Sequence, residues 1–329
     1  MTSPLATIAV VPRERFSIAP RSLLSILDAN AGAELVYVDA GSPPLVRQFL
    51  EQRAVRHDFR LISTERFVSP NAARNVALKQ VRTRYVALVD NDVLVSPGWL
   101  ERLVDCAETT GAWVVGPVVC SGQAPSQRIK TAGGSAEIVD ESGRRLLKAR
   151  CRRHGQLIDD VASSLLQEPV GQVPFHAVLI RMEALERVGA FDEALLSTAQ
   201  HTDFCLRVQA AGGTVYLEPA SHVTHVPPPP FEAIDLEYFQ LRWSDAWNRS
   251  SIEHFRGKWN LAADDPALAA MAERLDVHRR LTLEPYRRML RLLGPGPARW
   301  VENLIIAPWE QAASRRRYPQ HGAPDRRAA

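Results

Sequence analysis

The sequence predicts an α/β protein with a mostly parallel central sheet that is covered by helices on both faces. The first two-thirds of the chain alternate short apolar runs with segments in which apolar residues recur at helical spacing. The apolar runs are continuous, which is typical of strands buried on both faces of a sheet. Hydrophobic residues make up 46% of the chain and charged residues 23%, as is ordinary for a globular protein.

The strands follow from their apolar runs and from the residues that end them. The first run, residues 7–11, is closed by Pro12, and the second, residues 35–38, is closed by a turn that begins at Asp39. Further strands are expected at residues 59–62, 85–89, 113–119, 178–180, 214–217 and 223–226. Because ligands of parallel sheets bind beyond the carboxyl ends of the strands, Asp39 and Asp90 mark the predicted edge of a site.

The helices are recognised by their apolar spacing and by their start and stop residues. They are expected at residues 22–29, 45–53, 71–81, 182–188 and 202–211. Another helix is expected to begin at Ser96 as N-cap, with Pro97 in the first helical position. Gly189 and Gly212 supply the glycines that commonly follow a helix C-terminus.

Two later regions differ from this alternation. Residues 123–167 are less regular, and their Gly-Gly and Ser-Gly pairs predict hairpins or a mobile flap. Four consecutive prolines at 227–230 cannot continue a helix or a central strand and therefore mark a boundary. We expect one domain over residues 1–230 and a helical C-terminal extension over residues 231–329, with a basic tail that is disordered after Trp309.

Charge and cysteine content exclude several classes of protein. The net charge of +3 is too small to indicate a nucleic-acid partner. The four cysteines, Cys106, Cys120, Cys151 and Cys205, form no C-x-x-C pair, which argues against a disulfide framework or a zinc site. No apolar run approaches the roughly 20 residues of a membrane span, and the N-terminus does not resemble a signal peptide. We therefore expect a cytoplasmic protein.

The C-terminal region has its own charge balance. Residues 271–329 hold 12 Arg against 6 Asp and Glu, a balance of +6. A basic region attached to a slightly acidic body suggests an anionic partner, such as the inner face of a membrane, reached as a peripheral contact. The alternative is a solvated helix with a frayed basic end.

Asp90 and Asp92 stand one residue apart, directly after the buried strand at 85–89. In extended geometry alternate side chains point the same way, so both carboxylates are expected to face one ligand. Two such oxygen ligands suit Mg²⁺ or Mn²⁺, which also contacts substrate phosphates. The alternative is a turn in which the aspartates cap backbone N–H groups.

Other short motifs share a fixed order with this pair. They are Val38-Asp39-Ala40-Gly41-Ser42, Ala73-Arg74-Asn75, Asp90-Asn91-Asp92, Val188-Gly189-Ala190-Phe191-Asp192-Glu193 and Thr202-Asp203-Phe204-Cys205-Leu206-Arg207, followed by a Gly-Gly pair, an apolar strand and His225. In this order and spacing, over roughly residues 5–230, the chain resembles the family 2 glycosyltransferases with the GT-A fold.

The resemblance implies a hexosyltransferase-type enzyme. It would move a sugar from a nucleoside diphosphate sugar, most simply a UDP-sugar, to a hydroxyl of a saccharide, lipid-linked or small-molecule acceptor, with inversion and with Mn²⁺ or Mg²⁺. The residues that it implies for donor binding are Pro12, Asp39, Arg74, Asn75, Asp90 and Asn91. Asp92 would hold the cation, and His225 would be a further metal or phosphate contact or else a histidine satisfied at a strand end.

Two departures from the family pattern affect these roles. The family has Glu-Asp just before T-D-x-x-L-R, and that Asp is the expected general base, whereas this chain has Gln200-His201. Either His201 is the base, or Asp203 has replaced it, or the chain binds a donor without transferring sugar. In the donor turn, Pro43-Pro44 stand in place of the usual ending, which leaves the donor preference open.

Two other functions are compatible with parts of the sequence. A D-x-D after an apolar strand also begins the phosphatases of the haloacid dehalogenase type, but there it normally follows the first strand of the domain. A donor-binding or scaffold protein derived from a glycosyltransferase would explain the missing acidic base. Against it, both aspartates of the pair are retained.

The tryptophans of the C-terminal region allow three interpretations. They are Trp243, Trp247, Trp259, Trp300 and Trp309. They could stack on an acceptor sugar, contact a membrane surface beside Arg279, Arg280, Arg287, Arg288 and Arg291, or pack the helices onto the core domain. Packing is the simplest expectation for most of them.

Overall fold

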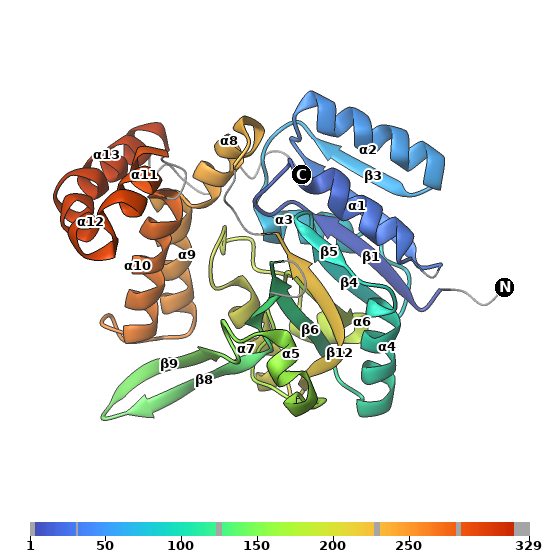
Figure 1. Ribbon diagram of the computed structural model, residues 1–329. Helices are drawn as coiled ribbons and strands as arrows, with labels where there is room; N and C mark the ends of the chain where they lie inside the picture. The colour runs from blue at the N-terminus through green and yellow to red at the C-terminus, as the bar shows by residue number, and fades with distance from the viewer. Residues whose placement is uncertain (1–3, 31, 123–126, 227–230, 281–283, 319–329) are drawn as a thin grey trace. The chain divides into compact units, whose positions relative to one another are not determined.

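The computed structural model describes residues 4–30, 32–122, 127–226, 231–280 and 284–318 (Figure 1). The chain divides into two compact units. The first holds Met1–Ile138, Lys148–Asp192 and Gln200–Pro227, and the second holds Val139–Leu147, Glu193–Ala199 and Pro228–Ala329. The second unit thus takes two inner segments as well as the C-terminal region. The division into domains at residue 230 stays a prediction, and Pro227–Pro230 lie outside the described residues.

The first unit is built on a ten-stranded sheet of order β10-β12-β6-β11-β4-β1-β2-β3, with β5 paired to β12 and β7 to β6. Its strands are β1 Ala6–Val11, β2 Glu34–Ala40, β3 Arg60–Thr64, β4 Tyr85–Asp90, β5 Val93–Val95, β6 Val114–Ser121, β7 Arg128–Thr131, β10 Glu168–Pro169, β11 Ala177–Arg181 and β12 Val215–His225. Neighbours pair in parallel from β3 through β4 and again between β6 and β12, while β11 runs antiparallel between these two groups. The predicted mostly parallel sheet is confirmed.

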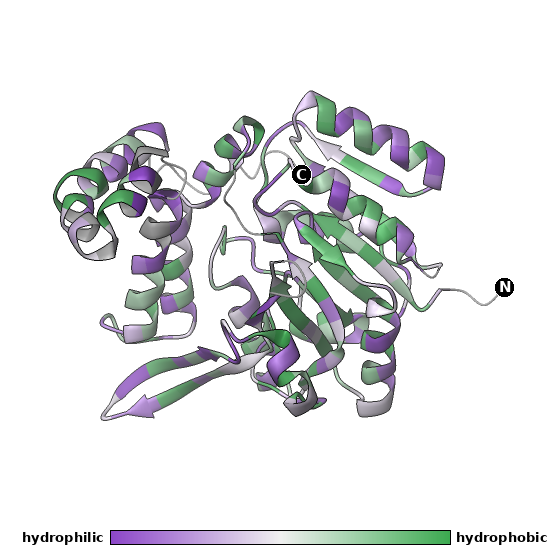
Figure 2. Ribbon diagram, in the orientation of Figure 1, coloured by the Kyte–Doolittle hydropathy of each residue, from purple (hydrophilic) through white to green (hydrophobic). Residues whose placement is uncertain are grey.

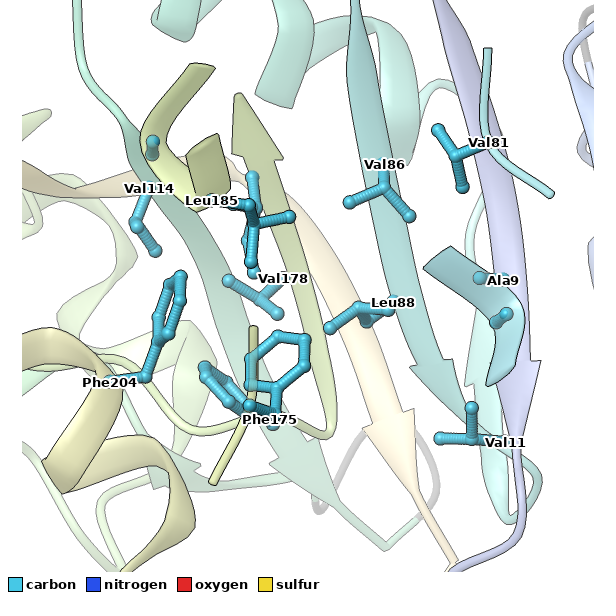
Figure 3. Packing of buried hydrophobic residues seen from close by; sticks show 14 of the residues in the cluster. Ala9, Val11, Val81, Val86, Leu88, Val114, Phe175, Val178, Leu185 and Phe204 are labelled. Carbon is cyan, nitrogen blue, oxygen red and sulfur yellow. The ribbon is translucent and has the colours of Figure 1, made fainter. Parts of the chain in front are cut away.

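Helices cover both faces of this sheet. They are α1 Ala19–Asp28, α2 Pro44–His57, α3 Pro70–Leu78, α4 Trp99–Thr110, α5 Ile158–Val161, α6 Met182–Val188 and α7 Gln200–Ala210, with a 3₁₀ turn at Ala162–Ser164. Helices α3, α6 and α7 contribute to one apolar cluster with the sheet, in which Leu88 of β4 and Phe204 of α7 take part (Figure 3). In β1, Ala9 and Val11 belong to this cluster, and the intervening Val10 is fully buried as well. Burial of both faces explains why the strands read as continuous apolar runs.

The structure corrects three local expectations. Helix α4 begins at Trp99 with Gly98 as N-cap at φ 76°, so the predicted start at Ser96 and Pro97 is wrong. A left-handed cap suits glycine, which has no Cβ to clash. The two last strands predicted in the first two-thirds of the chain form one strand, β12, with an irregularity between Glu218 and His222. Strand β5 was not expected.

The irregular region contains a hairpin, as one of the two expectations had it. Strands β8 (Gly134–Glu141) and β9 (Arg144–Cys151) form a separate two-stranded sheet. Residues 123–126 lie outside the described part of the chain.

The C-terminal region is helical, as predicted. Its elements are α8 Ala233–Arg242, α9 Asp245–Lys258, α10 Pro266–Arg280, α11 Glu284–Leu293, α12 Pro295–Val301, a π-helix at Glu302–Ile306 and α13 Ala307–Arg317. Because α13 runs to Arg317, the expected disorder is wrong for the residues between Trp309 and that point. Residues 319–329 lie outside the description. Within the described chain, no helix has the length and apolar character needed to cross a membrane.

Two of the arginines that one interpretation of the sequence placed beside a membrane are buried in ion pairs. Arg279 contacts Asp245 at 3.0 Å and Glu310 at 2.7 Å, and Arg280 contacts Glu302 at 2.7 Å. These arginines therefore bind the last helices to α9 and α10 instead of facing outward.

Candidate active site

The site lies where β1 and β4 end side by side. These strands are parallel, and their register pairs Val11 with Asp90. The loops that follow are joined, since the Asn91 N–H donates to the Val11 carbonyl and the Arg13 N–H donates to Asn91 Oδ1, both at 2.9 Å. The structure therefore brings Pro12, which follows β1, together with the predicted aspartate motif.

A second pairing adds the end of the sheet's last strand. Strand β12 pairs with β5 so that His225 lies opposite Val93, and the Val226 N–H donates to the Asp92 carbonyl at 3.0 Å. This pairing places His225 Nε2 3.8 Å from Asp92 Oδ2. The predicted association of Asp92 with His225 is thus a direct consequence of the strand order.

Glu14, Asp92 and His225 form the acidic cluster of the site. One ligand atom from each residue lies within 4.8 Å of the others, and all three side chains are buried. Neither Asp92 carboxylate oxygen has a hydrogen-bond partner among the described residues. A buried carboxylate without a partner is costly, so these oxygens fit a cation that would satisfy them.

The acidity of Asp92 follows from the same surroundings. Burial is the largest influence, and the neighbouring carboxylates of Glu14 and Asp90 add to it, so that the pKa of Asp92 rises from 3.8 to about 8. In the absence of a cation, the carboxyl therefore holds a proton near neutral pH. A divalent ion would displace that proton and ionise the group.

His225 is kept neutral, as a metal ligand must be. Burial and the nearby Lys130 and His176 hold the pKa of the imidazole well below its usual value. Lys130 Nζ lies 3.0 Å from His225 Nδ1, and burial beside Arg13 lowers the Lys130 pKa to about 8. The cluster therefore combines two carboxylates and a neutral imidazole with cationic groups at its margin.

Asp90 belongs to a different set of contacts. Its carboxylate lies 3.0 Å from Arg13, 3.3 Å from Arg74 and 3.3 Å from His176. The residues after Asp90 form a turn and not extended chain. Alternation therefore does not apply, and among the described residues the group suited to a metal includes Asp92 but not Asp90. That the two carboxylates face one ligand stays a prediction.

The two residues of the predicted arginine–asparagine motif have different surroundings. Arg74 is fully buried, donates to Asn71 and to Gln200 Oε1 at 3.1 Å, and lies over the Phe175 ring. Asn75 instead donates to the Phe191 carbonyl at 2.9 Å and accepts from the Phe191 N–H at 3.0 Å. Its amide thus holds the loop after α6, and the implied donor contact stays a prediction for Asn75.

Asp39 closes the turn after β2. Its Oδ1 accepts from the Ser42 N–H at 2.9 Å, and Arg47 Nε lies 3.3 Å from its Oδ2. The carboxylate is buried, so a contact with the base of a nucleotide remains a prediction for this residue.

His201 and Asp203 lie in the first turn of α7. The half-buried His201 packs its ring edge against Phe175, and burial together with Arg13 and Arg74 lowers its pKa to about 4. Asp203 Oδ2 instead accepts from Arg207 Nε at 3.0 Å, one turn along the helix. The imidazole is therefore neutral at pH 7, whereas Asp203 is engaged in an ion pair.

Glu14, Lys130 and His176 were not anticipated. Ligands bind beyond the carboxyl ends of parallel strands, and this rule, which identified Asp90, also applies to β1. The charged residues after Pro12 could therefore have been found from the parallel pairing of β1 with β4. Lys130 and His176 reach the site from β7 and from the segment before β11, which no local signal indicates.

A pH dependence of metal binding follows from the acidity of Asp92. Because its pKa is about 8, cation binding is expected to release close to one proton at pH 7. The affinity for Mn²⁺ should rise up to about tenfold per pH unit from pH 6 until it levels off near pH 8. Calorimetric titration with MnCl₂ in two buffers of different ionisation enthalpy measures the released proton directly. A heat that is independent of buffer, with an affinity independent of pH, would contradict the assignment of Asp92.

Comparisons with known proteins agree on a family. The profile of Glycosyl transferase family 2 matches residues 8–187. A Pre-mycofactocin glycosyltransferase of Mycobacterium tuberculosis is 29% identical over 223 residues, which are 66% of this chain and 42% of that protein. The chain spans less than half of the length of the curated relatives that it matches.

Two solved structures share the fold at low sequence identity. GalNAc-T7 with UDP, GalNAc and Mn²⁺ has a TM-score of 0.53 and 15% identity, over 88% of this chain and 58% of that chain. The mannosyltransferase PcManGT of Pyrobaculum calidifontis, in complex with GDP-Man and Mn²⁺, has a TM-score of 0.51 and 14% identity, over 95% of this chain and 85% of that chain.

Proposed function

The chain belongs to glycosyl transferase family 2 and has the GT-A fold, and from this we propose that it transfers a sugar from a nucleoside diphosphate sugar to an acceptor hydroxyl. One observation carries the proposal: at the carboxyl edge of the sheet, Asp92 presents two oxygens that have no hydrogen-bond partner among the described residues, close to Glu14 and His225. Membership of the family also removes the phosphatase alternative.

The diphosphate of the donor would be held by the cations around the acidic cluster. Arg13 is attached to this edge through its contacts with Asp90 and Glu14, and Lys130 lies against His225. Each of these groups can neutralise phosphate oxygens at the point where the strands end. The buried Arg74 supports Asp90 from behind and keeps that carboxylate in place.

Asp92, with Glu14 and His225, would hold a divalent cation, Mn²⁺ or Mg²⁺. When bound, the cation neutralises the negative charge that grows on the diphosphate as the sugar leaves. The protein's own contribution is to keep the two carboxylates and the neutral imidazole close together before the donor binds. Such preorganisation is a large part of electrostatic catalysis.

His201 is our proposed general base for a direct, inverting transfer. Its neutral imidazole can accept the proton of the acceptor hydroxyl. In the protein without donor, burial foremost and then the nearby Arg13 and Arg74 lower the pKa of His201 to about 4. A bound diphosphate would compensate those positive charges and raise the pKa of His201 toward the range of a useful base.

The identity of the donor and of the acceptor forms the remaining part of the proposal. A UDP-sugar remains our first choice, with Asp39 as the contact for the base. The acceptor is a saccharide, a lipid-linked or a small-molecule hydroxyl. The alternative function is a protein that binds the donor without transfer, which the absence of an acidic residue at position 201 favours.

Donor binding is tested first by calorimetric titration of UDP, GDP and dTDP with and without Mn²⁺. We expect one of the three to bind in the micromolar range and at least about tenfold more weakly without the cation. Release of the nucleotide from the matching sugar donors, in the presence of candidate acceptors, then separates a transferase from a protein that only binds. Failure of all three nucleotides to bind would overturn the proposal.

A further inference from the structure

The last helix of the chain buries charges and exposes apolar residues. Helix α12, the π-helix and α13 are continuous over residues 295–317, since Val301 and Ala307 at the two junctions keep right-handed helical angles. Its carboxylates Glu302 and Glu310 are buried. This is the reverse of the usual surface helix, in which the apolar stripe faces inward.

The inward face is fixed by ion pairs with α10. Glu302 contacts Arg280 and Glu310 contacts Arg279, both at 2.7 Å. Glu302 and Glu310 are eight residues apart, which is more than two turns of a regular α-helix with about 3.6 residues per turn. A π turn takes up one extra residue, which brings both carboxylates to the same side. Pro308 favours this wider turn because it lacks the N–H that would bond to the carbonyl four residues earlier.

The outward face is apolar and large. The set here called the C-terminal apolar face consists of Trp300 (73% exposed), Leu304 (58%), Ile305 (64%) and Trp309 (63%) of this helix, together with Leu292 (84%) and Leu293 (48%) at the end of α11. Figure 2 shows hydrophobic residues recurring along the C-terminal helices. Tryptophan at this exposure lacks the packing that buried Trp243 has in the same unit. Several large apolar side chains exposed within so short a stretch of chain indicate an interaction surface.

The positive charge of the residues around the face indicates an anionic partner. Residues 284–318 contain seven Arg and three Glu, a balance of +4, and two of these Glu are already paired with α10. Arg316 lies exposed on the same helix, next to Arg315, which is also exposed and contacts Asp245 at 3.1 Å. Arginine next to exposed tryptophan and leucine is the composition of helices that lie in the interface of anionic membranes. A second copy would instead bring like charges together.

We infer that the C-terminal apolar face is a docking surface for an anionic lipid bilayer, in which Trp300, Leu304, Ile305 and Trp309 enter the interface. The helix lies along the bilayer and does not cross it, in keeping with the lack of a spanning helix in the described chain. The inference goes beyond the proposed transfer reaction, and vesicle binding tests it without donor or acceptor.

The test is co-sedimentation of the full chain with phosphatidylcholine vesicles, with and without phosphatidylglycerol. We expect binding to the anionic vesicles that weakens as salt is added. The double variant W300S/W309S should bind at least about tenfold more weakly. Arg316→Gln should reduce binding to the anionic vesicles about fivefold.

The matched control is L45S/V55S, which replaces two exposed apolar residues of the first unit, and it should bind as the wild type does. Far-ultraviolet circular dichroism verifies that each variant stays folded. No binding of the wild type to the anionic vesicles would overturn the inference. So would sedimentation equilibrium that shows a dimer abolished by W300S/W309S without vesicle binding, since the face would then belong to a second copy.

Discussion

Asp92→Asn is expected to abolish metal-dependent donor binding and, in the same protein, to raise its thermal stability. The loss follows because an amide cannot supply the charge that a cation needs at this position. We expect kcat/KM to fall by about 10³-fold or more, measured by nucleotide release at saturating Mn²⁺.

The gain in stability comes from the same carboxyl group. Its pKa in the folded protein, about 8, lies above the ordinary 3.8, so the fold disfavours the ionised form. The free energy of unfolding of the cation-free protein should therefore fall as pH rises from about 4 to 8. An asparagine does not ionise and escapes this loss. We expect its Tm at pH 8, by calorimetry with chelator, to exceed that of the wild type by at least about 3 °C.

A matched change elsewhere separates this effect from a general change in charge. Asp105 is an exposed residue of α4, and Asp105→Asn should alter neither the Tm nor the donor affinity beyond error. Retention of Mn²⁺-dependent binding by Asp92→Asn would show that the cation is held elsewhere. A lower Tm at pH 8 would show that Asp92 is stabilised by a contact that the structure lacks.

His201→Ala is expected to lower kcat by about 10²- to 10⁴-fold while the donor affinity changes by less than about threefold. This split follows because a base acts on the acceptor hydroxyl and makes no essential contact with the donor. Single-turnover assays together with donor titration measure the two quantities separately. Wild-type activity in His201→Ala would exclude His201 as the base.

The variant His201→Asp tests the role more specifically than a loss of activity can. It introduces the residue type that the family resemblance places at this position, so it should recover a large part of the activity that His201→Ala loses.

The pH profile gives a second test of His201. The base works only when deprotonated, so activity should fall as pH drops through its pKa. In the wild type, this fall in activity should occur at higher pH for kcat than for kcat/KM, because a bound diphosphate raises the pKa of His201 above its value of about 4 in the free protein.

The sequence predicted the sheet and its functional edge because buried parallel strands leave a strong local signal. It predicted Asp92 and His225 from motif order, and strand pairing then explained their proximity. It missed Glu14 because charged residues after a proline look like an ordinary solvated loop. Only the register of β1 against β4 brings that loop to the site.

Side-chain direction was the least predictable property. Asn75 lies in the same motif as Arg74, yet one turns to the loop after α6 and the other to Asp90. Arg279 and Arg280 have the appearance of a solvated helix end in sequence, but acidic partners more than twenty residues later bury them. Such partners are chosen by tertiary packing, which leaves no periodic signal.

The acidic cluster draws its members from residues 14, 92 and 225, which lie near the beginning, middle and end of the first unit. During synthesis, such a site cannot exist until the last strand has left the ribosome and joined the sheet. A cation that binds there would stabilise only the chain in which these distant segments have already come together, and so would act late in folding. Metal starvation should accordingly be seen first as slower maturation and faster proteolytic turnover of the newly made protein.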